Sequence, residues 1–344
     1  MASISSSLAL PCLAFHRAAD RSTVLYSVPE KKRIAAGADT DDDVLADKTI
    51  LPTARGYVLA HGTTTFLYSP QSRRKIDLPP LDIDQDLLVD YNCLLSDDPA
   101  APGCVVLLVE LDALFIWYHR IGGADGGEWH EHEYDIGSQQ YDPADSTLLE
   151  KSVITPIAAC RGRFYFNPLD EMGVIDFSST TPDTGTGPAF SSIAAGSVSD
   201  EESGSPRGQT SVDFLVESEG ELYMVSLLFA VTGLRTVTGA SVQVMDFESS
   251  RWRGVGDLGG RAFVLSMYNF GASCESGGEA GLRGDCVYVA YPVAKKLLVF
   301  DVKDGSMESV KLDDAPESDK AFWVLPRTCL VRHFVTQPVY SVIR

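Results

Sequence analysis

The apolar residues of this chain fall in short runs that end at polar turns, and the runs come in pairs. Gly162–Phe166 precedes Gly173–Phe177, and Gly284–Val289 precedes Lys296–Val302. β-Branched and aromatic residues dominate these runs, which favours strands over helices. The turn after the last run, Lys303–Met307, contains Asp-Gly, a strong hairpin signal between apolar runs. The pattern predicts a meander of β-hairpins.

One unit of this pattern repeats along the chain. Leu25–Ile34 and Leu67–Ile76 share an opening Leu-Tyr-Ser, a basic triplet and a closing isoleucine, at an offset of 42 residues. Looser copies of the strand and turn follow at Phe115–Tyr118, Val174–Phe177, Val244–Phe247 and Val299–Val302. Units of ~40–50 residues are the period expected of propeller blades, and radial repetition protects the open edges that hairpins leave. The sequence therefore predicts an all-β, single-domain β-propeller of six or seven blades, built from hairpin meanders like those of kelch and WD repeats.

The strand units continue through most of the chain, so we predict one propeller domain over residues 10–326. Residues 1–9 are expected to form a short N-terminal extension, and residues 327–344 a C-terminal tail or a closing strand. Ser178–Ser211 is rich in Ser, Thr, Gly and Pro and lacks periodic apolar residues, so we expect a mobile surface insertion (178–211) there. Gly271–Gly281 is interpreted as a shorter Gly/Ser loop.

One segment has two interpretations. Five apolar residues have the spacing of one helix face, namely Leu87, Leu88, Tyr91, Leu94 and Leu95. Asp82, Asp84 and Asp86 lie just before them, where a helix N-terminus favours acidic residues. The alternative is a strand over Val89–Ser96, which ends at the polar run that follows.

Charge and composition exclude several classes of function. The chain has 48 acidic against 28 basic residues, a formal net charge of −20. Such a surface repels phosphate backbones, because nucleic-acid binding draws much of its affinity from Lys and Arg. No apolar run approaches the ~20 residues that span a bilayer. We therefore expect a soluble, intracellular protein that binds neither nucleic acid nor membrane and that meets a basic surface on its partner.

The cysteines and the N-terminus bear on the compartment. The 7 cysteines are scattered and form no C-x-x-C pair, which indicates neither a disulfide framework nor a zinc site. The start of the chain is Ser-rich and free of acids, as in organelle transit peptides. Strands predicted at Leu10–Phe15 and Thr23–Val28 argue against a removable presequence. We expect a cytoplasmic or nuclear protein, with the chloroplast or the mitochondrion as the alternative.

No stretch of the sequence carries a recognisable reaction centre. Gly254–Gly259 fits G-x-G-x-x-G, but a dinucleotide fingerprint needs a helix after it, and Gly260–Leu265 has the pattern of a strand. Trp129–His132 places two histidines on one strand face with no third ligand nearby in sequence. A G-x-S-x-G elbow is absent. The sequence predicts no cofactor, no metal and no catalytic residue, and leaves glycoside hydrolysis open, which needs only paired carboxylates.

Two basic triplets are the candidate partner-binding residues. They are Lys31, Lys32 and Arg33 in one repeat and Arg73, Arg74 and Lys75 in the next. Since they occupy equivalent turns of neighbouring blades, they are expected to form one positive spot on an acidic body, with plain solvated turns as the alternative. Ser199 and Ser205 are candidate phosphorylation sites, because acidic residues follow the first and a proline follows the second within the predicted insertion.

Several blocks resemble the plant KIB-type β-propeller family, long described as a plant F-box-associated domain of unknown function. The blocks are Leu10–Phe15, Tyr26–Glu30, Arg55–Leu59, Leu67–Pro70, Ile76–Leu81, Leu258–Phe263 and, most specific of all, Gly281–Tyr288, Val299–Met307 and Phe322–Pro326. The resemblance covers about residues 10–326. It implies a single propeller that presents loops for binding, with no catalytic residue to carry over.

The resemblance also implies a class of partner. Many relatives place an F-box helix bundle ahead of the propeller and act as substrate receptors of ubiquitin ligases, and the best understood act on kinases of the glycogen-synthase-kinase type. About nine residues precede the first predicted strand here, too few for those helices, so direct docking to a ligase core through an F-box is not expected. We predict a non-catalytic protein-recognition propeller. The alternative is a carbohydrate-active enzyme with paired carboxylates in the propeller channel.

Overall fold

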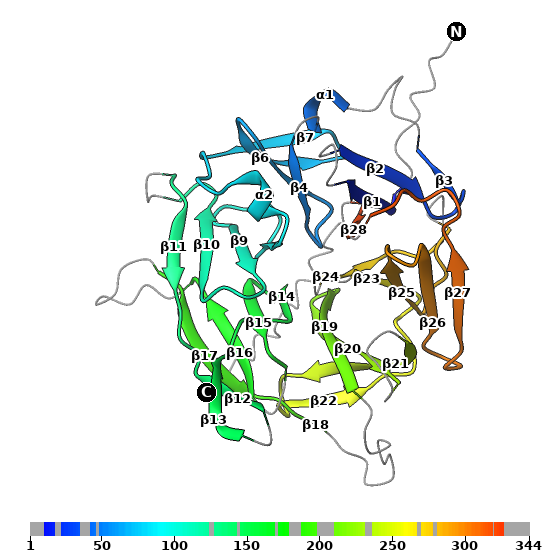
Figure 1. The fold of residues 1–344 in the computed structure, drawn as a ribbon. Helices are drawn as coiled ribbons and strands as arrows, with labels where there is room; N and C mark the ends of the chain where they lie inside the picture. The colour runs from blue at the N-terminus through cyan, green and yellow to red at the C-terminus, as the bar shows by residue number, and fades with distance from the viewer. Residues whose placement is uncertain are drawn as a thin grey trace, which may run out of the picture.

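The computed structural model is a ring of six β-sheets around a central axis (Figure 1). It describes residues 10–17, 22–34, 42–45, 48–123, 127–142, 145–168, 171–178, 187–197, 210–230, 236–266, 270–277, 281–318 and 320–326. Helix within these residues is limited to α1 (Asp42–Leu45) and α2 (Gln85–Leu88). The prediction of an all-β, single-domain propeller is confirmed, and the blades number six.

Each of the six sheets is one blade, named here from its innermost strand outward. Blade 1 contains β28 (Lys320–Val324), β1 (Cys12–Arg17), β2 (Ser22–Ser27) and β3 (Lys32–Arg33); blade 2 contains β4 (Thr49–Pro52), β5 (Val58–His61), β6 (Thr65–Ser69) and β7 (Arg74–Leu78). Blade 3 contains β8 (Tyr91–Leu95), β9 (Val105–Glu110), β10 (Phe115–Arg120) and β11 (His130–Glu133); blade 4 contains β14 (Ile157–Cys160), β15 (Arg163–Phe166), β16 (Glu171–Asp176) and β17 (Ala189–Ala194).

The last two blades have five strands each. Blade 5 contains β19 (Thr210–Ser218), β20 (Glu221–Phe229), β21 (Val237–Asp246), β22 (Arg251–Gly254) and the short β18 (Gly196–Ser197); blade 6 contains β24 (Phe270–Cys274), β23 (Ala262–Ser266), β25 (Cys286–Tyr291), β26 (Lys296–Asp301) and β27 (Met307–Lys311). A separate two-stranded hairpin, β12 (Ser138–Asp142) and β13 (Asp145–Lys151), lies in the connection between blades 3 and 4.

The blades pack face to face, so their central strands are apolar on both sides. In β9, Val106 and Leu108 join the cluster between blades 2 and 3, whereas Val105, Leu107 and Val109 join the cluster between blades 3 and 4. Successive strand residues point to opposite faces, and here both faces are covered. One such cluster fills each of the six interfaces between neighbouring blades. This packing explains why the strands read as uninterrupted apolar runs.

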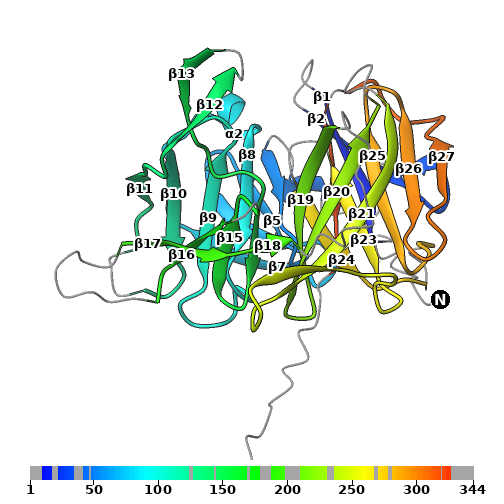
Figure 2. The same cartoon turned by 90° about the horizontal axis from the view of Figure 1, so that it is seen from below.

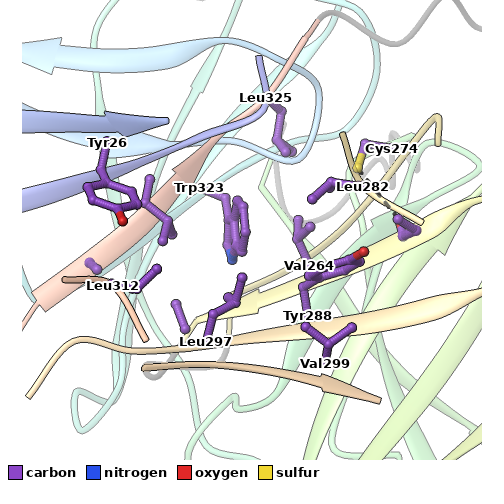
Figure 3. Packing of buried hydrophobic residues seen from close by; sticks show 14 of the residues in the cluster. Tyr26, Val264, Cys274, Leu282, Tyr288, Leu297, Val299, Leu312, Trp323 and Leu325 are labelled. Carbon is purple, nitrogen blue, oxygen red and sulfur yellow. Dashed lines mark hydrogen bonds between the residues drawn. The ribbon is translucent and has the colours of Figure 1, made fainter. Parts of the chain in front are cut away.

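The ring is closed by pairing the end of the described chain with its beginning. β28 runs antiparallel to β1, with Trp323 opposite Leu13. The Trp323 side chain is fully buried between blades 1 and 6, next to Leu297 and Leu312 (Figure 3). Its indole Nε1 donates a hydrogen bond of 2.9 Å to the carbonyl oxygen of Leu265. One alternative placed a closing strand within residues 327–344, whereas the closing strand β28 lies before them. Residues 327–344 and residues 1–9 lie outside the described part of the chain.

The repeat found in the sequence marks the third strand in blades 1 to 5 and the fourth strand, β26, in blade 6. In blades 1 and 2 the serine of Leu-Tyr-Ser accepts a backbone hydrogen bond from the turn that follows, at Ser27 Oγ and Ser69 Oγ. In blades 4, 5 and 6 an aspartate does the same: Asp176, Asp246 and Asp301 each accept from a backbone N–H two residues later, at 2.7–3.0 Å. Side chains of this kind stabilise tight turns. The recurring serines and aspartates are therefore turn residues.

The segment with two interpretations is mainly a strand. α2 is a single turn, capped where Asp84 accepts from the backbone N–H of Asp86 at 2.8 Å. β8 then begins at Tyr91, so the strand interpretation is confirmed. The predicted helix face does not form, because Leu87 is 63% exposed while Leu88 is buried. Helix is therefore limited to the single turn of α2.

The interpretation of Gly271–Gly281 as a loop was wrong over its first part. Gly271 to Cys274 belong to β24, the innermost strand of blade 6. A Cβ at Gly271 would lie 2.7 Å from the carbonyl oxygen of Leu215 in β19, so small residues allow two inner strands to approach closely. Ser273 and Ser218 then share a hydrogen bond of 2.8 Å between these strands. The small residues reflect close packing at the axis.

The prediction of a continuous surface insertion over 178–211 was also wrong in part. β17 pairs with β16 from Asp176↔Ala189 to Glu171↔Ala194 and completes blade 4. An outer strand is covered on one side only, so it needs few apolar residues, and Ser191 and Ser192 face solvent. That is why a polar composition concealed a strand. Ser199 and Ser205, the candidate phosphorylation sites, lie outside the described residues.

Candidate functional site

The connections between strands emerge alternately on two faces of the ring. We call the first the hairpin face, which carries the connections 79–90, 111–114 and 134–156 with α2 and the β12–β13 hairpin (Figure 2). The opposite turn face carries the connections 53–57, 96–104 and 161–162 and the turns at 28–31 and 70–73. A binding site on this fold can occupy either face or the channel between them.

The two basic triplets lie on the turn face, at equivalent positions of blades 1 and 2. Arg33 pairs with Tyr26 in β2 just as Lys75 pairs with Tyr68 in β6, which confirms the 42-residue correspondence. Both triplets have local partners: Arg33 Nε donates to the carbonyl oxygen of Asp314 at 2.6 Å, and Lys75 Nζ lies 2.7 Å from an Asp77 oxygen. A shared partner-binding spot at Lys31, Lys32, Arg33, Arg73, Arg74 and Lys75 stays a prediction.

The inner strands enclose a channel with two small cavities. The cavity toward the turn face has a volume of about 30 Å³ and is lined by Arg55, Glu217 and Asn92 among others. The cavity toward the hairpin face has a volume of about 60 Å³ and is lined by Asp90, Lys320 and again Asn92. Since a water molecule needs roughly 10–15 Å³ of such space, these cavities accommodate a few waters each.

The charged groups of the channel are engaged with one another or with backbone. Asp90 forms an ion pair with Lys320 of the closing strand. Glu217 Oε1 accepts from the backbone N–H of Gly220 at 2.8 Å, and Arg55 Nε donates to a carbonyl oxygen at the end of β8 at 3.1 Å. Among the residues that line the two cavities, each cavity has a single carboxylate, Glu217 or Asp90.

The carboxylates with shifted pKa values shift in one direction. Hydrogen-bond donors or cations beside them favour the ionised form and lower the pKa. Burial opposes this shift in all five carboxylates and is the largest single effect at Asp176, where the donors together still outweigh it. The five carboxylates are Asp135, Asp176, Asp246, Asp285 and Asp304. A general acid for glycoside cleavage needs a raised pKa. The carboxylates of this group therefore serve turns and ion pairs.

The G-x-G-x-x-G segment is a turn organised by a buried aspartate. Gly254 ends β22 and a strand, β23, follows at Ala262, as the sequence pattern predicted. Asp285 Oδ1 accepts from the backbone N–H groups of Leu258 and Gly260 at 2.7 and 2.9 Å, and Oδ2 lies 2.7 Å from Lys303 Nζ. The hydrogen bond from Lys303 lowers the pKa of Asp285 most. Asp285, just before β25 of blade 6, therefore holds the connection that links blade 5 to blade 6.

This geometry predicts a pH-dependent contribution of Asp285 to stability. Asp285→Asn is expected to lower the free energy of unfolding by about 1–2 kcal/mol at neutral pH. Because the folded-state pKa is below the unfolded value of about 3.9, the contribution is complete above about pH 5 and is lost as the pH falls through the folded-state pKa. Urea unfolding of both proteins between about pH 7 and pH 3 measures it.

The control is Asp77→Asn, since the Asp77 side chain is 79% exposed. It should change the free energy of unfolding by less than about 0.5 kcal/mol over the same pH range. A difference between wild type and Asp285→Asn that stays constant from pH 7 to pH 3 would contradict the assignment of the ion pair as its source.

The histidine pair of Trp129–His132 lies on β11, at the outer edge of blade 3. The His132 ring stacks on Phe190 of β17 in blade 4, with centroids 5.6 Å apart and planes 12° apart, and burial lowers the pKa of His132. Within the described ranges, no three His, Cys, Asp or Glu side chains are grouped to hold a metal ion. The structure thus gives His132 a packing contact between blades.

The cysteines in the described part of the chain are inert by position. Cys12, Cys93, Cys104, Cys160, Cys274 and Cys286 are all buried and free. Burial raises the pKa of the Cys12 thiol to about 12, so it stays protonated at neutral pH. Neither of the two short helices has the length or apolar character of a membrane span within the described residues.

Sequence reasoning missed the most prominent feature of the hairpin face. The β12–β13 hairpin rises beyond the blades in the side view, together with α2 (Figure 2). A signal was available in the sequence, because Pro143 separates the runs Ser138–Asp142 and Asp145–Lys151, which pair as strands. It was concealed because the hairpin has no counterpart in the repeat and its strands are mostly polar.

A search of curated proteins found no match. A solved structure, the crystal structure of a functionally unknown protein from Desulfotomaculum acetoxidans DSM 771, is similar with 12% identity and a TM-score of 0.36, covering 92% of this chain and 89% of that chain. The KIB1-4 beta-propeller family matches residues 25–318, from the third strand of blade 1 through blade 6. The chain belongs to the KIB1-4 β-propeller family.

Proposed function

We propose that this propeller is a non-catalytic protein-recognition module. The observation that carries the proposal is the channel lining, where each of the two cavities has a single carboxylate and that carboxylate is already engaged, Asp90 with Lys320 and Glu217 with the backbone N–H of Gly220. A site for a small substrate needs a pocket with room for it and groups free to react. A ligand would then bind to the exposed connections on one of the two faces. Such connections suit a macromolecule as the ligand.

Family membership supports the same function. In this proposal the chain corresponds to the substrate-binding part of F-box receptors, and the partner is a protein that one face of the ring recognises. The competing function, carbohydrate cleavage by paired carboxylates, gains no support from the described channel lining, because Asp90 and Glu217 line different cavities. Two carboxylates flanking one bond need to share a site.

Affinity purification of the tagged full chain from cells that express it, followed by mass spectrometry, tests the proposal. We expect a reproducible client protein, or ligase components together with a client. In parallel, the purified chain is incubated with a panel of aryl glycosides and oligosaccharides, and we expect no turnover above the buffer rate.

The matched variant is the double substitution Asp90→Asn with Glu217→Gln, which removes both channel carboxylates. Client capture should persist in this variant. Turnover by the wild type that the variant abolishes, combined with the absence of any reproducible client, would overturn the recognition function.

A further inference from the structure

Three leucines are exposed on the hairpin face, one from each of three consecutive connections. Leu87 of α2 is 63% exposed, Leu114 between β9 and β10 is 36% exposed, and Leu149 of β13 is 67% exposed. Single exposed leucines are ordinary. These three lie on connections of blades 2 to 4 that share one face of the ring, so a partner on that face can reach each of them. A partner with apolar side chains would cover them.

The connections that carry these leucines are rich in acidic residues. Connection 79–90 contains four aspartates and no Lys or Arg, and residues 110–114 contain two acids and no Lys or Arg. The described part of 134–151 contains four acids and Lys151. On the turn face of the same blades, the described connections carry three arginines, Arg55, Arg73 and Arg161, against a similar number of acids. The charge of these blades is thus strongly one-sided.

The β12–β13 hairpin is the second unusual feature of this face. It forms a two-stranded sheet that joins no blade in the part of the chain that the structure describes. Isolated two-stranded hairpins are marginally stable in water, whereas a third strand or a packed surface stabilises them. Lys151 ties the base of the hairpin to Asp135 at 2.5 Å. Within the described residues, the outer edges of β12 and β13 pair with no other strand, so they offer backbone hydrogen bonds to a partner.

We propose that the hairpin face of blades 2 to 4 docks a basic segment of a partner protein that carries apolar side chains between its Lys or Arg residues. The leucines bind the apolar side chains, and exposed acids of the three connections, such as Asp82, Asp112 and Glu150, attract the basic ones. Charge complementarity selects this occupant, because a second copy of the chain would bring an equally acidic face. The proposal rests on the recognition function and adds its face and its class of partner.

Binding of defined peptides to the purified full chain tests this surface. Three fluorescein-labelled peptides of about 12 residues are compared by fluorescence anisotropy: repeats of Lys-Leu-Arg, of Lys-Ser-Arg and of Glu-Leu-Asp. The Lys-Leu-Arg peptide should bind at least about tenfold more tightly than the other two, and its affinity should fall as salt rises.

Two hairpin-face variants separate the apolar and charged contributions. Leu87→Ser with Leu114→Ser and Leu149→Ser should remove the advantage of Lys-Leu-Arg over Lys-Ser-Arg. Asp82→Asn with Asp112→Asn and Glu150→Gln should weaken the Lys-Leu-Arg peptide about tenfold and flatten its salt dependence. All six side chains are exposed, so both variants should unfold at the temperature of the wild type.

The matched control neutralises three exposed acids of the turn face, Glu128→Gln, Glu248→Gln and Glu275→Gln. It should bind the Lys-Leu-Arg peptide as the wild type does. An equal loss in this control would show general attraction to an acidic protein and overturn the docking surface. A change of oligomeric state in the leucine variant, measured by sedimentation, would assign the face to self-association instead.

The outcome also distinguishes this inference from the recognition function. A client that is captured equally by the wild type and by both hairpin-face variants removes the proposed docking surface while recognition stands. If no client is captured and glycoside turnover is found, the recognition function itself is removed.

Discussion

Replacing Trp323 with alanine is expected to lower the free energy of unfolding by about 3–5 kcal/mol. The indole is fully buried between blades 1 and 6, and its Nε1 donates to the Leu265 carbonyl oxygen. Truncation leaves a cavity in the interface that closes the ring (Figure 3) and removes the hydrogen bond to the Leu265 carbonyl oxygen. Urea unfolding followed by circular dichroism measures the midpoint and its slope.

Met307→Ala is the control for this substitution, because Met307 begins the outer strand of blade 6 and is 40% exposed. Its cost should be about 1 kcal/mol or less. Trp323→Phe should recover most of the packing and lack only the Nε1 hydrogen bond. A loss below about 1 kcal/mol for Trp323→Ala would mean that the closing strand contributes little to the stability of the ring.

Gly271→Val is expected to destabilise the protein by about 3 kcal/mol, and Gly271→Ala by about 1–3 kcal/mol. A Cβ at this position would lie 2.7 Å from the Leu215 carbonyl oxygen and 2.8 Å from a Val216 methyl carbon. The oxygen belongs to the backbone of β19, so relief requires two inner strands to separate. Thermal unfolding of the variants measures the effect.

Gly239→Ala is the matched control, since Gly239 also lies in a strand and its added Cβ would meet Leu228 at an ordinary 3.8 Å. Little destabilisation is expected there, because alanine loses less backbone freedom on folding than glycine does. If Gly271→Ala and Gly239→Ala behave alike, the close approach of β19 and β24 is not needed for stability.

The blades were predictable from sequence because local chemistry specifies them. A serine or aspartate that ends the third strand also holds the next turn, as Ser69 and Asp246 do, so the same residues mark the repeat and build it. The run Gly162–Phe166 indicated a strand for a related reason, since Phe164, Tyr165 and Phe166 are all buried although neighbouring residues point to opposite faces. The fold class follows from such repeated local rules.

Other parts depend on long-range packing that composition does not show. Gly271 resembled a loop residue because its role is a contact with Leu215, which is distant in sequence. β17 was concealed because an outer strand needs little apolar surface. The candidate surface was missed for a third reason: Leu87, Leu114 and Leu149 belong to three separate connections, and only the fold places these connections on one face of the ring. Residue type alone could not separate them from core leucines.

Closure through β28 also changes what the repeats require. In an open solenoid the first and last repeats each expose an apolar face, and special capping repeats with polar outer faces must cover them. Here β28 and β1 place the two ends of the described chain in one sheet, so blade 6 and blade 1 cover each other. No blade is terminal, and apolar residues such as Leu13 and Phe15 can occupy the first strand as freely as they would an internal one.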